Sequence, residues 1–407
     1  MRTLLALLLV AATPIVSSAQ SRPASFDDVL NIKAIQGASI SPDGTQVIYT
    51  VRQWVSDQDR MEARTHVWKV STDGIAPARQ ITFGERGDSH PQFSPDGKFI
   101  SFLSARPSSA PGASGSAEAR PQIYLMQADG GEAWKLTDAK EGVPTQGLNY
   151  SWSPDSTKIA FVTTDPRSAE EEANIKKRDD ERVFEGDFRY SHAWVVDVAT
   201  RAATRVTEGT NYTVQGAPSW SPDGKQFVFA AATTPMLRDN RRDVYLATLG
   251  GQANGPTGEQ ANGPTGGQAN GPTGGQANGR TGGQANGRTG GQANGPTGGQ
   301  ANGPTGLRAS VEKISTNWGS DGSPRWSPNG ATIAWVSEPN TTEPLPDGTA
   351  SSVIRQSRLM TYDVNARTIR DTLTPQFDSD AGTPIWTNEG TRVMWFSGKR
   401  AYNEAFA

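Results

Sequence analysis

The pentapeptide Trp220-Ser221-Pro222-Asp223-Gly224 decides the fold of this chain, because variants of it recur along the sequence. Proline presets the backbone for the second position of a β-turn, aspartate or asparagine suits the third, and glycine accepts the left-handed geometry that follows. One unit of such a repeat cannot bury its own apolar face, so the recurrence indicates stacked units. The other five copies read Ile40-Ser41-Pro42-Asp43-Gly44, Phe93-Ser94-Pro95-Asp96-Gly97, Trp152-Ser153-Pro154-Asp155-Ser156, Trp326-Ser327-Pro328-Asn329-Gly330 and Trp386-Thr387-Asn388-Glu389-Gly390.

Each turn is followed by a run with the two-residue alternation of a β-strand, and the eighth residue after its Ser or Thr is always aromatic. Two further strand-like runs follow each of the first five turns, which makes four antiparallel strands per unit. The pattern therefore predicts an all-β fold, a β-propeller of four-stranded antiparallel blades. The sixth unit stops after Phe396, so we expect its outer hairpin to be missing and the last blade to be incomplete. The six aromatic residues are Tyr49, Phe102, Phe161, Phe229, Trp335 and Trp395.

The fourth unit contains an array of seven near-perfect octapeptides, Gly-Gly-Gln-Ala-Asn-Gly-Pro-Thr, at residues 250–305. In the other complete units the two outer strands are 12 or 13 residues apart, whereas here Tyr245 and Ile314 are 69 apart, and 56 of these belong to the array. The array is therefore predicted to be an insertion into the outer hairpin of the fourth blade. It has no apolar anchor and lacks the regular aspartate of calcium-binding glycine-rich repeats, so we expect a disordered, inert linker.

The composition suggests an exported protein. Arg2, an apolar run from Leu4 to Val16 and the small residues 17–19 form a secretory signal that is too short to span a bilayer. The chain has no cysteine, which excludes disulfides and cysteine chemistry, and its net charge of −3 argues against a nucleic-acid partner. We expect a signal peptide at 1–19, a lead-in segment at 20–38 and the propeller at 39–407. The predicted location is the periplasm or the medium, with no membrane attachment after cleavage.

The sequence offers no catalytic constellation. A serine hydrolase of the α/β type needs a Gly-x-Ser-x-Gly elbow, and the nearest string, residues 112–116, has the wrong spacing in a linker-like stretch. The three histidines, His66, His90 and His192, are interpreted as strand-end or loop residues, and their spacing does not suggest a metal site. We therefore predict no catalytic residue, no metal and no cofactor in this chain.

Two groups of charged residues need a separate interpretation. The aspartates of the turns, Asp43, Asp96, Asp155 and Asp223, recur because the turn recurs, which favours a structural role. The mixed-charge stretch from Asp165 to Tyr190 is expected to be an exposed, partly helical excursion of the third blade. Glu185, Asp187 and Arg189 lie in it; a structural role is favoured, with a loop that shapes a binding entrance as the alternative.

The repeat resembles the WD-like repeat of Tol-type periplasmic propellers and of the prolyl oligopeptidase family of serine peptidases. Two features favour the peptidase family: the first repeat begins soon after residues 26–32, with no room for a preceding domain, and the second and third units carry long excursions. The resemblance covers roughly residues 26–249 and 307–400. It implies a seven- or eight-bladed propeller that caps a C-terminal hydrolase domain carrying Ser, Asp and His. No catalytic residue of that family has a match here.

The resemblance leads to a hypothesis about function. We expect this chain to be the propeller portion of an exported serine peptidase, which restricts access so that only short peptides reach the catalytic domain. Its partner would then be a peptide substrate in the full-length parent. The alternative is a non-catalytic, Tol-like periplasmic propeller that binds protein partners through its face.

Overall fold

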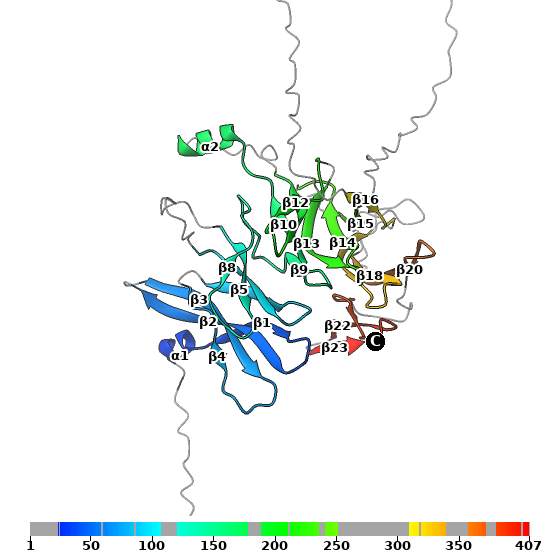
Figure 1. Ribbon diagram of the computed structural model, residues 1–407. Helices are drawn as coiled ribbons and strands as arrows, with labels where there is room; N and C mark the ends of the chain where they lie inside the picture. Colours follow the sequence, from blue (N-terminus) through cyan, green and yellow to red (C-terminus); the bar gives the residue numbers. More distant parts are fainter. Residues whose placement is uncertain are drawn as a thin grey trace, which may run out of the picture. The chain divides into compact units, whose positions relative to one another are not determined.

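The computed structural model describes residues 23–406 apart from 24, 58–59, 85–86, 107–119, 178–188, 211, 236–240, 251–308, 317–318, 339–356, 372–379 and 400–401. The predicted signal peptide and octapeptide array lie outside these residues. The chain falls into two compact units, Met1–Thr145 and Gln146–Ala407, and each is described by itself. Figure 1 shows that both are built almost wholly of antiparallel strands, as the turn repeat predicts.

The first unit contains a short helix, α1 (Phe26–Leu30), and two four-stranded sheets in which sequential strands are neighbours. The hairpin of β2 and β3 is much longer than that of β6 and β7 and extends well past the strands beside it (Figure 1). The first sheet is β1 (Ala34–Ile40), β2 (Gln46–Asp57), β3 (Arg60–Ser71) and β4 (Arg79–Gln80); the second is β5 (Asp88–Phe93), β6 (Phe99–Ser104), β7 (Gln122–Gln127) and β8 (Trp134–Lys135).

The second unit contains three four-stranded sheets, one three-stranded sheet and the helix α2 (Ala169–Lys176). Ser168 caps this helix: its hydroxyl accepts the backbone N–H of Glu171, and the Glu171 side chain accepts the backbone N–H of Ser168. The sheets are β9 (Tyr150–Trp152), β10 (Lys158–Thr164), β11 (Ser191–Asp197) and β12 (Ala203–Arg205); β13 (Thr213–Trp220), β14 (Gln226–Ala232), β15 (Arg242–Leu249) and β16 (Ala309–Lys313); β17 (Ser320–Trp326), β18 (Thr332–Glu338), β19 (Arg358–Asp363) and β20 (Thr368–Asp371); and β21 (Ile385–Trp386), β22 (Val393–Lys399) and β23 (Tyr402–Phe406).

Each sheet is one blade, and two details differ from the sequence prediction. The first blade begins at Ala34, within the expected lead-in segment 20–38, because β1 pairs with β2 from Ala34 opposite Arg52 onward. The sixth blade has a third strand, β23, paired with β22 from Trp395 opposite Phe406, so only its fourth strand is missing from the described residues. The prediction that the sixth unit stops after Phe396 was wrong. The apolar alternation of β22 ends at Phe396, but the backbone pairing of this strand continues to Lys399.

The fourth blade is complete on both sides of the octapeptide array. β15 and β16 pair directly, from Tyr245 opposite Lys313 to Leu249 opposite Ala309. The ladder closes as a normal hairpin although the array separates its strands in sequence. This pairing agrees with the interpretation of residues 250–305 as an insertion into the outer hairpin.

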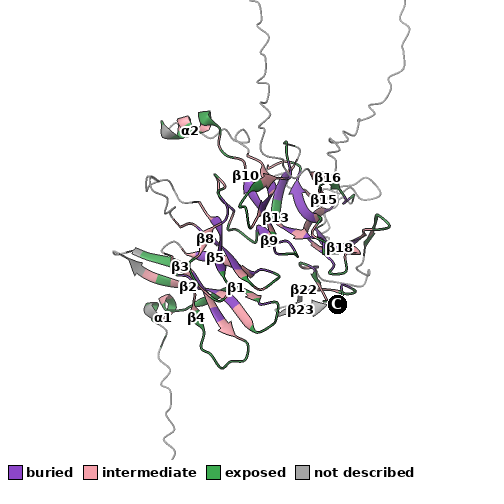
Figure 2. Ribbon diagram, viewed as in Figure 1, coloured by how far each residue is buried: buried purple, intermediate pink, exposed green. Residues whose placement is uncertain are grey.

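Within each unit the core consists of apolar layers between neighbouring blades, and Figure 2 shows that many of the buried residues lie in the strands of the sheets. In the second unit Ala160 and Val195 of one blade pack against Phe227 and Phe229 of the next. In the first unit Ile48 and Val67 pack against Phe102 in the same way. The residues that follow one another along a strand therefore alternate between two cores, which is why the middle strands are apolar at nearly every position.

Burial at equivalent repeat positions differs between the blades. In the first blade Ile40 is 60% exposed and Tyr49 is half-buried, whereas the equivalent Trp220 and Phe229 of the fourth blade are 7% and 0% exposed. In the sixth blade Trp386 is half-buried and Phe396 is 55% exposed. The aromatic pattern alone therefore does not determine burial.

The turn repeat is held by one hydrogen-bond pattern. In the fourth blade the Ser221 hydroxyl donates to the Asp223 carboxylate at 2.7 Å and accepts from the Gln226 backbone at 3.0 Å, while Asp223 accepts from the Lys225 backbone at 3.1 Å. The same bonds occur in the first, second and third blades. They also occur in the fifth blade, where Asn329 takes the place of the aspartate. The recurrent serine and acid are therefore required by the turn itself.

Replacing Ser156 with glycine is expected to stabilise the protein by about 0.5–1 kcal/mol. Ser156 stands where other turns have glycine and has a φ of 59°, close to the 68° of Gly224. Removing its Cβ relieves left-handed strain, which outweighs the greater freedom of glycine in the unfolded chain. Urea denaturation measures the change, with Thr157→Gly as the control. A loss of stability in Ser156→Gly would show that its side-chain contacts outweigh the strain.

Candidate functional site

The carboxylates of the turns are occupied by structural hydrogen bonds. Asp43 accepts from the Ser41 hydroxyl and from the backbone and hydroxyl of Thr45, and the bond from Ser41 is the main cause that lowers the pKa of Asp43. The bond from Ser221 likewise lowers the pKa of Asp223. A carboxylate held ionised by its own turn is a poor general acid. The structural interpretation of these aspartates is therefore supported.

The third blade contains a chain of Thr207, His192 and Asp165 that has the order of a hydrolytic triad; its first two members are buried and Asp165 is partly exposed. His192 is fully buried; its Nδ1 lies 3.1 Å from the Thr207 hydroxyl and its Nε2 lies 3.3 Å from an Asp165 oxygen. Arg205 forms two contacts with Asp165, at 3.2 and 3.3 Å. Burial, and then the charge of Arg205, lower the pKa of His192 against the opposing effect of Asp165, so the ring is neutral near pH 7.

This chain of residues is not a catalytic triad. The Thr207 hydroxyl is 1% exposed and accepts the backbone N–H of Ala193, so no substrate atom can approach it. The same backbone cap occurs in the first, second and fourth blades, where a hydroxyl two residues past the fourth strand accepts a backbone N–H of the third strand. The other capped N–H groups belong to Val67, Ile123 and Val244, and their hydroxyls to Thr82, Thr137 and Ser315.

We call the end of a blade where its second strand finishes and its third strand begins the loop end of that blade. Charged pairs lie near the caps at this end. The buried Asp88 binds Arg106 at 3.1 Å, and Arg106 lies over the rings of Phe102 and Tyr124. In the second unit the buried Asp243 binds Lys313 at 2.9 Å. The long connections that follow β6, β10, β14 and β18 also leave from the loop end.

The structure places the remaining predicted residues as follows. His192 lies at the start of β11, as the strand-end interpretation allows, whereas His66 lies inside β3, and both are buried. His90 lies in β5 with a φ of 53°, at a bulge where the equivalent residues of the first and fourth blades are Gly37 and Gly216. Arg189 lies at the end of the excursion, next to Tyr190, whose carbonyl accepts the Asp165 N–H. Glu185, Asp187 and residues 112–116 are outside the described part.

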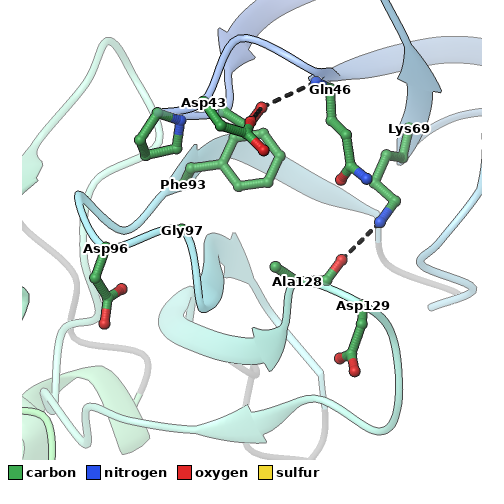
Figure 3. Close-up of a pocket in the computed structure, with 10 residues that line it drawn as sticks. Asp43, Gln46, Lys69, Phe93, Asp96, Gly97, Ala128 and Asp129 are labelled. Atoms are coloured by element: carbon green, nitrogen blue, oxygen red, sulfur yellow. Dashed lines mark hydrogen bonds between the residues drawn. The ribbon is translucent and has the colours of Figure 1, made fainter.

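A second feature lies on the opposite, turn-bearing end of the first unit. A pocket of about 330 Å³ opens between its two blades, bounded by the first two turns and by the side chain of Lys69 (Figure 3). The sequence interpretation missed Lys69. Aligning the outer strands would have shown it, since the equivalent positions of the next three blades are Leu125, Val195 and Leu246.

The described residues give no sign of two other kinds of site. Among them, no group of three or more histidine or acidic side chains is placed to hold a metal ion. No helix in the same part of the chain is both long and apolar enough to cross a membrane.

Comparison with known proteins connects this fold to peptidases. The chain is 28% identical over 233 residues to an uncharacterized peptidase of Bacillus subtilis, YuxL. The alignment covers 54% of this chain and 33% of YuxL. It is 27% identical over 149 residues to dipeptidyl-peptidase 5 of Porphyromonas endodontalis, covering 37% of this chain and 19% of that protein. The chain resembles the propeller portion of prolyl oligopeptidase-family peptidases. No family model matches the sequence.

Solved structures agree at the level of the fold. An acylaminoacyl peptidase aligns with 92% of this chain at a TM-score of 0.52 and 13% identity, and 44% of that chain is covered. A puromycin-hydrolyzing peptidase of Mycobacterium tuberculosis aligns with 92% at a TM-score of 0.53 and 10% identity, with 45% of it covered. This chain thus spans a third of the length of YuxL and less than half of these two structures. The resemblance stated from sequence is confirmed over the propeller region.

Proposed function

We propose that this chain is the substrate-gating propeller of an exported serine peptidase that acts on short peptides. The observation that carries the proposal is the match to a peptidase over the blades, and the long connections between the second and third strands of several blades agree with it. In this scheme the loop end faces the catalytic domain, and its connections limit the size of what enters. The nucleophile, base and acid belong to a hydrolase domain that this sequence does not include.

The purified chain is expected to show no peptidase activity of its own. The physical reason is the burial of Thr207 and His192 in the Thr-His-Asp arrangement of the third blade, together with the absence of a Gly-x-Ser-x-Gly elbow from the sequence. Incubation with a fluorophosphonate probe and with dipeptide and acyl-peptide reporters measures this. Stoichiometric labelling of a serine together with reporter hydrolysis would overturn the assignment of the chemistry to another domain.

The second candidate is a protein-binding propeller without catalysis. It is favoured by a run of exposed apolar side chains before and within β1: Phe26 is 76%, Ile32 62% and Ile35 70% exposed. Reading the gene past the codon for Ala407 separates the two candidates. A downstream Gly-x-Ser-x-Gly between a strand and a helix supports the peptidase, and an immediate in-frame stop supports the binding protein.

A further inference from the structure

Lys69 occupies a position that other blades use for their apolar core. It lies two residues after Val67, whose backbone N–H is capped by the Thr82 hydroxyl. Lys69 is only 7% exposed. Counted in the same way from the capped residue, the next three blades have Leu125, Val195 and Leu246, which are 0%, 1% and 4% exposed. A charged side chain that replaces an apolar one at a repeated core position departs from local consistency, which is a common sign of a functional site.

The pocket of Figure 3 lies beside this amine. Lys69 points across it, and its Nζ donates to the backbone carbonyl of Ala128 at 2.6 Å. The walls include the apolar side chains of Pro42 and Phe93. The space of about 330 Å³ is large enough for a small organic group next to the amine. Lys69 thus combines burial, a fixed position and adjacent free volume.

The charges around the pocket determine the state of the amine. Asp43 and Asp96 line it, but their carboxylates accept hydrogen bonds from their own turns. Burial is the main effect on Lys69 and lowers its pKa; Arg79 acts in the same direction, and Asp129 opposes it. A desolvated lysine holds a larger share of neutral, nucleophilic amine near neutral pH than a solvated one.

We propose that Lys69 is a covalent modification site that takes small activated acyl groups, such as those of acyl phosphates or active esters. The lone pair of the neutral Nζ attacks the acyl carbon, and the carbon–leaving-group bond breaks with its electron pair on the leaving group. The ammonium proton then passes to water, which leaves a neutral amide in the pocket. The product has no charge and matches the apolar character of this position in the other blades. This proposal is independent of the proposed peptidase function.

Competitive acetylation tests the site. The folded chain is treated with limiting acetyl phosphate or the N-hydroxysuccinimide ester of acetic acid, and modification of each lysine is followed by peptide mass spectrometry. We expect Lys69 to be modified faster near neutral pH than Lys98, whose side chain is 72% exposed. In urea the advantage should be lost, and Lys69→Met should remove this product while leaving the rate at Lys98 unchanged. Equal or slower modification of Lys69 in the folded chain would overturn the proposal.

A second measurement covers the case in which the reagents react too slowly for comparison. Because the pKa of Lys69 is lower in the folded than in the unfolded chain, the unfolded chain binds more protons between the two values. The stability of the wild type should therefore rise with pH in that range, relative to Lys69→Met. Denaturation at a series of alkaline pH values measures the difference. A flat difference would show that the amine is solvated and would contradict the reactive state proposed for it.

Discussion

Replacing Phe229 with alanine is expected to lower the free energy of unfolding by about 3–5 kcal/mol. Phe229 is fully buried in the layer between the third and fourth blades. Its ring stacks on Tyr245 at a centroid distance of 5.7 Å and lies 6.0 Å from the ring of Phe227. Removing it leaves a cavity that the surrounding strands cannot close, because their hydrogen-bonded ladders fix the spacing. Denaturation followed by far-UV circular dichroism measures the loss.

Phe396→Ala is the matched control for this prediction. Phe396 is also a phenylalanine of a second strand in the second unit, but its side chain is 55% exposed. Its replacement is expected to change stability by less than about 1 kcal/mol. If the two variants lost equal stability, the layered core between blades would not be the main source of stability of this unit.

Gly142→Ala is expected to destabilise the first unit by about 3 kcal/mol. Gly142 has a φ of 76°, which disfavours any side chain, and an added Cβ would lie 2.7 Å from the Pro121 carbonyl oxygen and 2.9 Å from Cβ of Arg120. The N–H of Val143 donates to the same Pro121 carbonyl, so the backbone cannot move away without losing a hydrogen bond. Differential scanning calorimetry measures the change.

Gly74→Ala separates the two causes of that loss. Gly74 lies in the same unit with a φ of 72°, but nothing lies within 4 Å of the added Cβ. Only the left-handed strain remains, and we expect a loss of about 1 kcal/mol. Equal losses in the two variants would show that the contact with Pro121 relaxes freely.

The sequence was sufficient for the architecture because each blade repeats the same chemistry. The turn residues Ser221, Pro222 and Asp223 form a local hydrogen-bond unit, and a unit of this kind can be recognised without tertiary information. The following strand alternates between two apolar layers, which a period of two reveals. The pairing of β15 with β16 across the octapeptide array was also predictable, since the other blades supply the ordinary spacing.

The sequence was insufficient where burial depends on a neighbour. Tyr49 and Phe229 occupy equivalent positions, yet Tyr49 is half-buried, whereas Phe229 is fully buried in a layer that it shares with residues of the third blade. The caps of the third strands were missed because their partners, such as the Ala193 N–H and the Thr207 hydroxyl, are 14 residues apart in sequence and meet only through the outer hairpin. Lys69 was missed because a lysine in a strand is normally solvent-facing, and only comparison between blades shows that its position is in the core.

Size selection by the product of the whole gene tests the central claim most directly. The gene is expressed from its first codon to its natural stop, and initial rates are measured for a short peptide reporter and for a folded protein that contains the same cleavable sequence in a surface loop. If the blades gate a serine peptidase, a fluorophosphonate probe labels one serine beyond Ala407, and the short peptide is cleaved while the folded protein is not. Cleavage of both at similar rates would contradict the gating role, and a product with neither label nor activity would contradict the peptidase assignment.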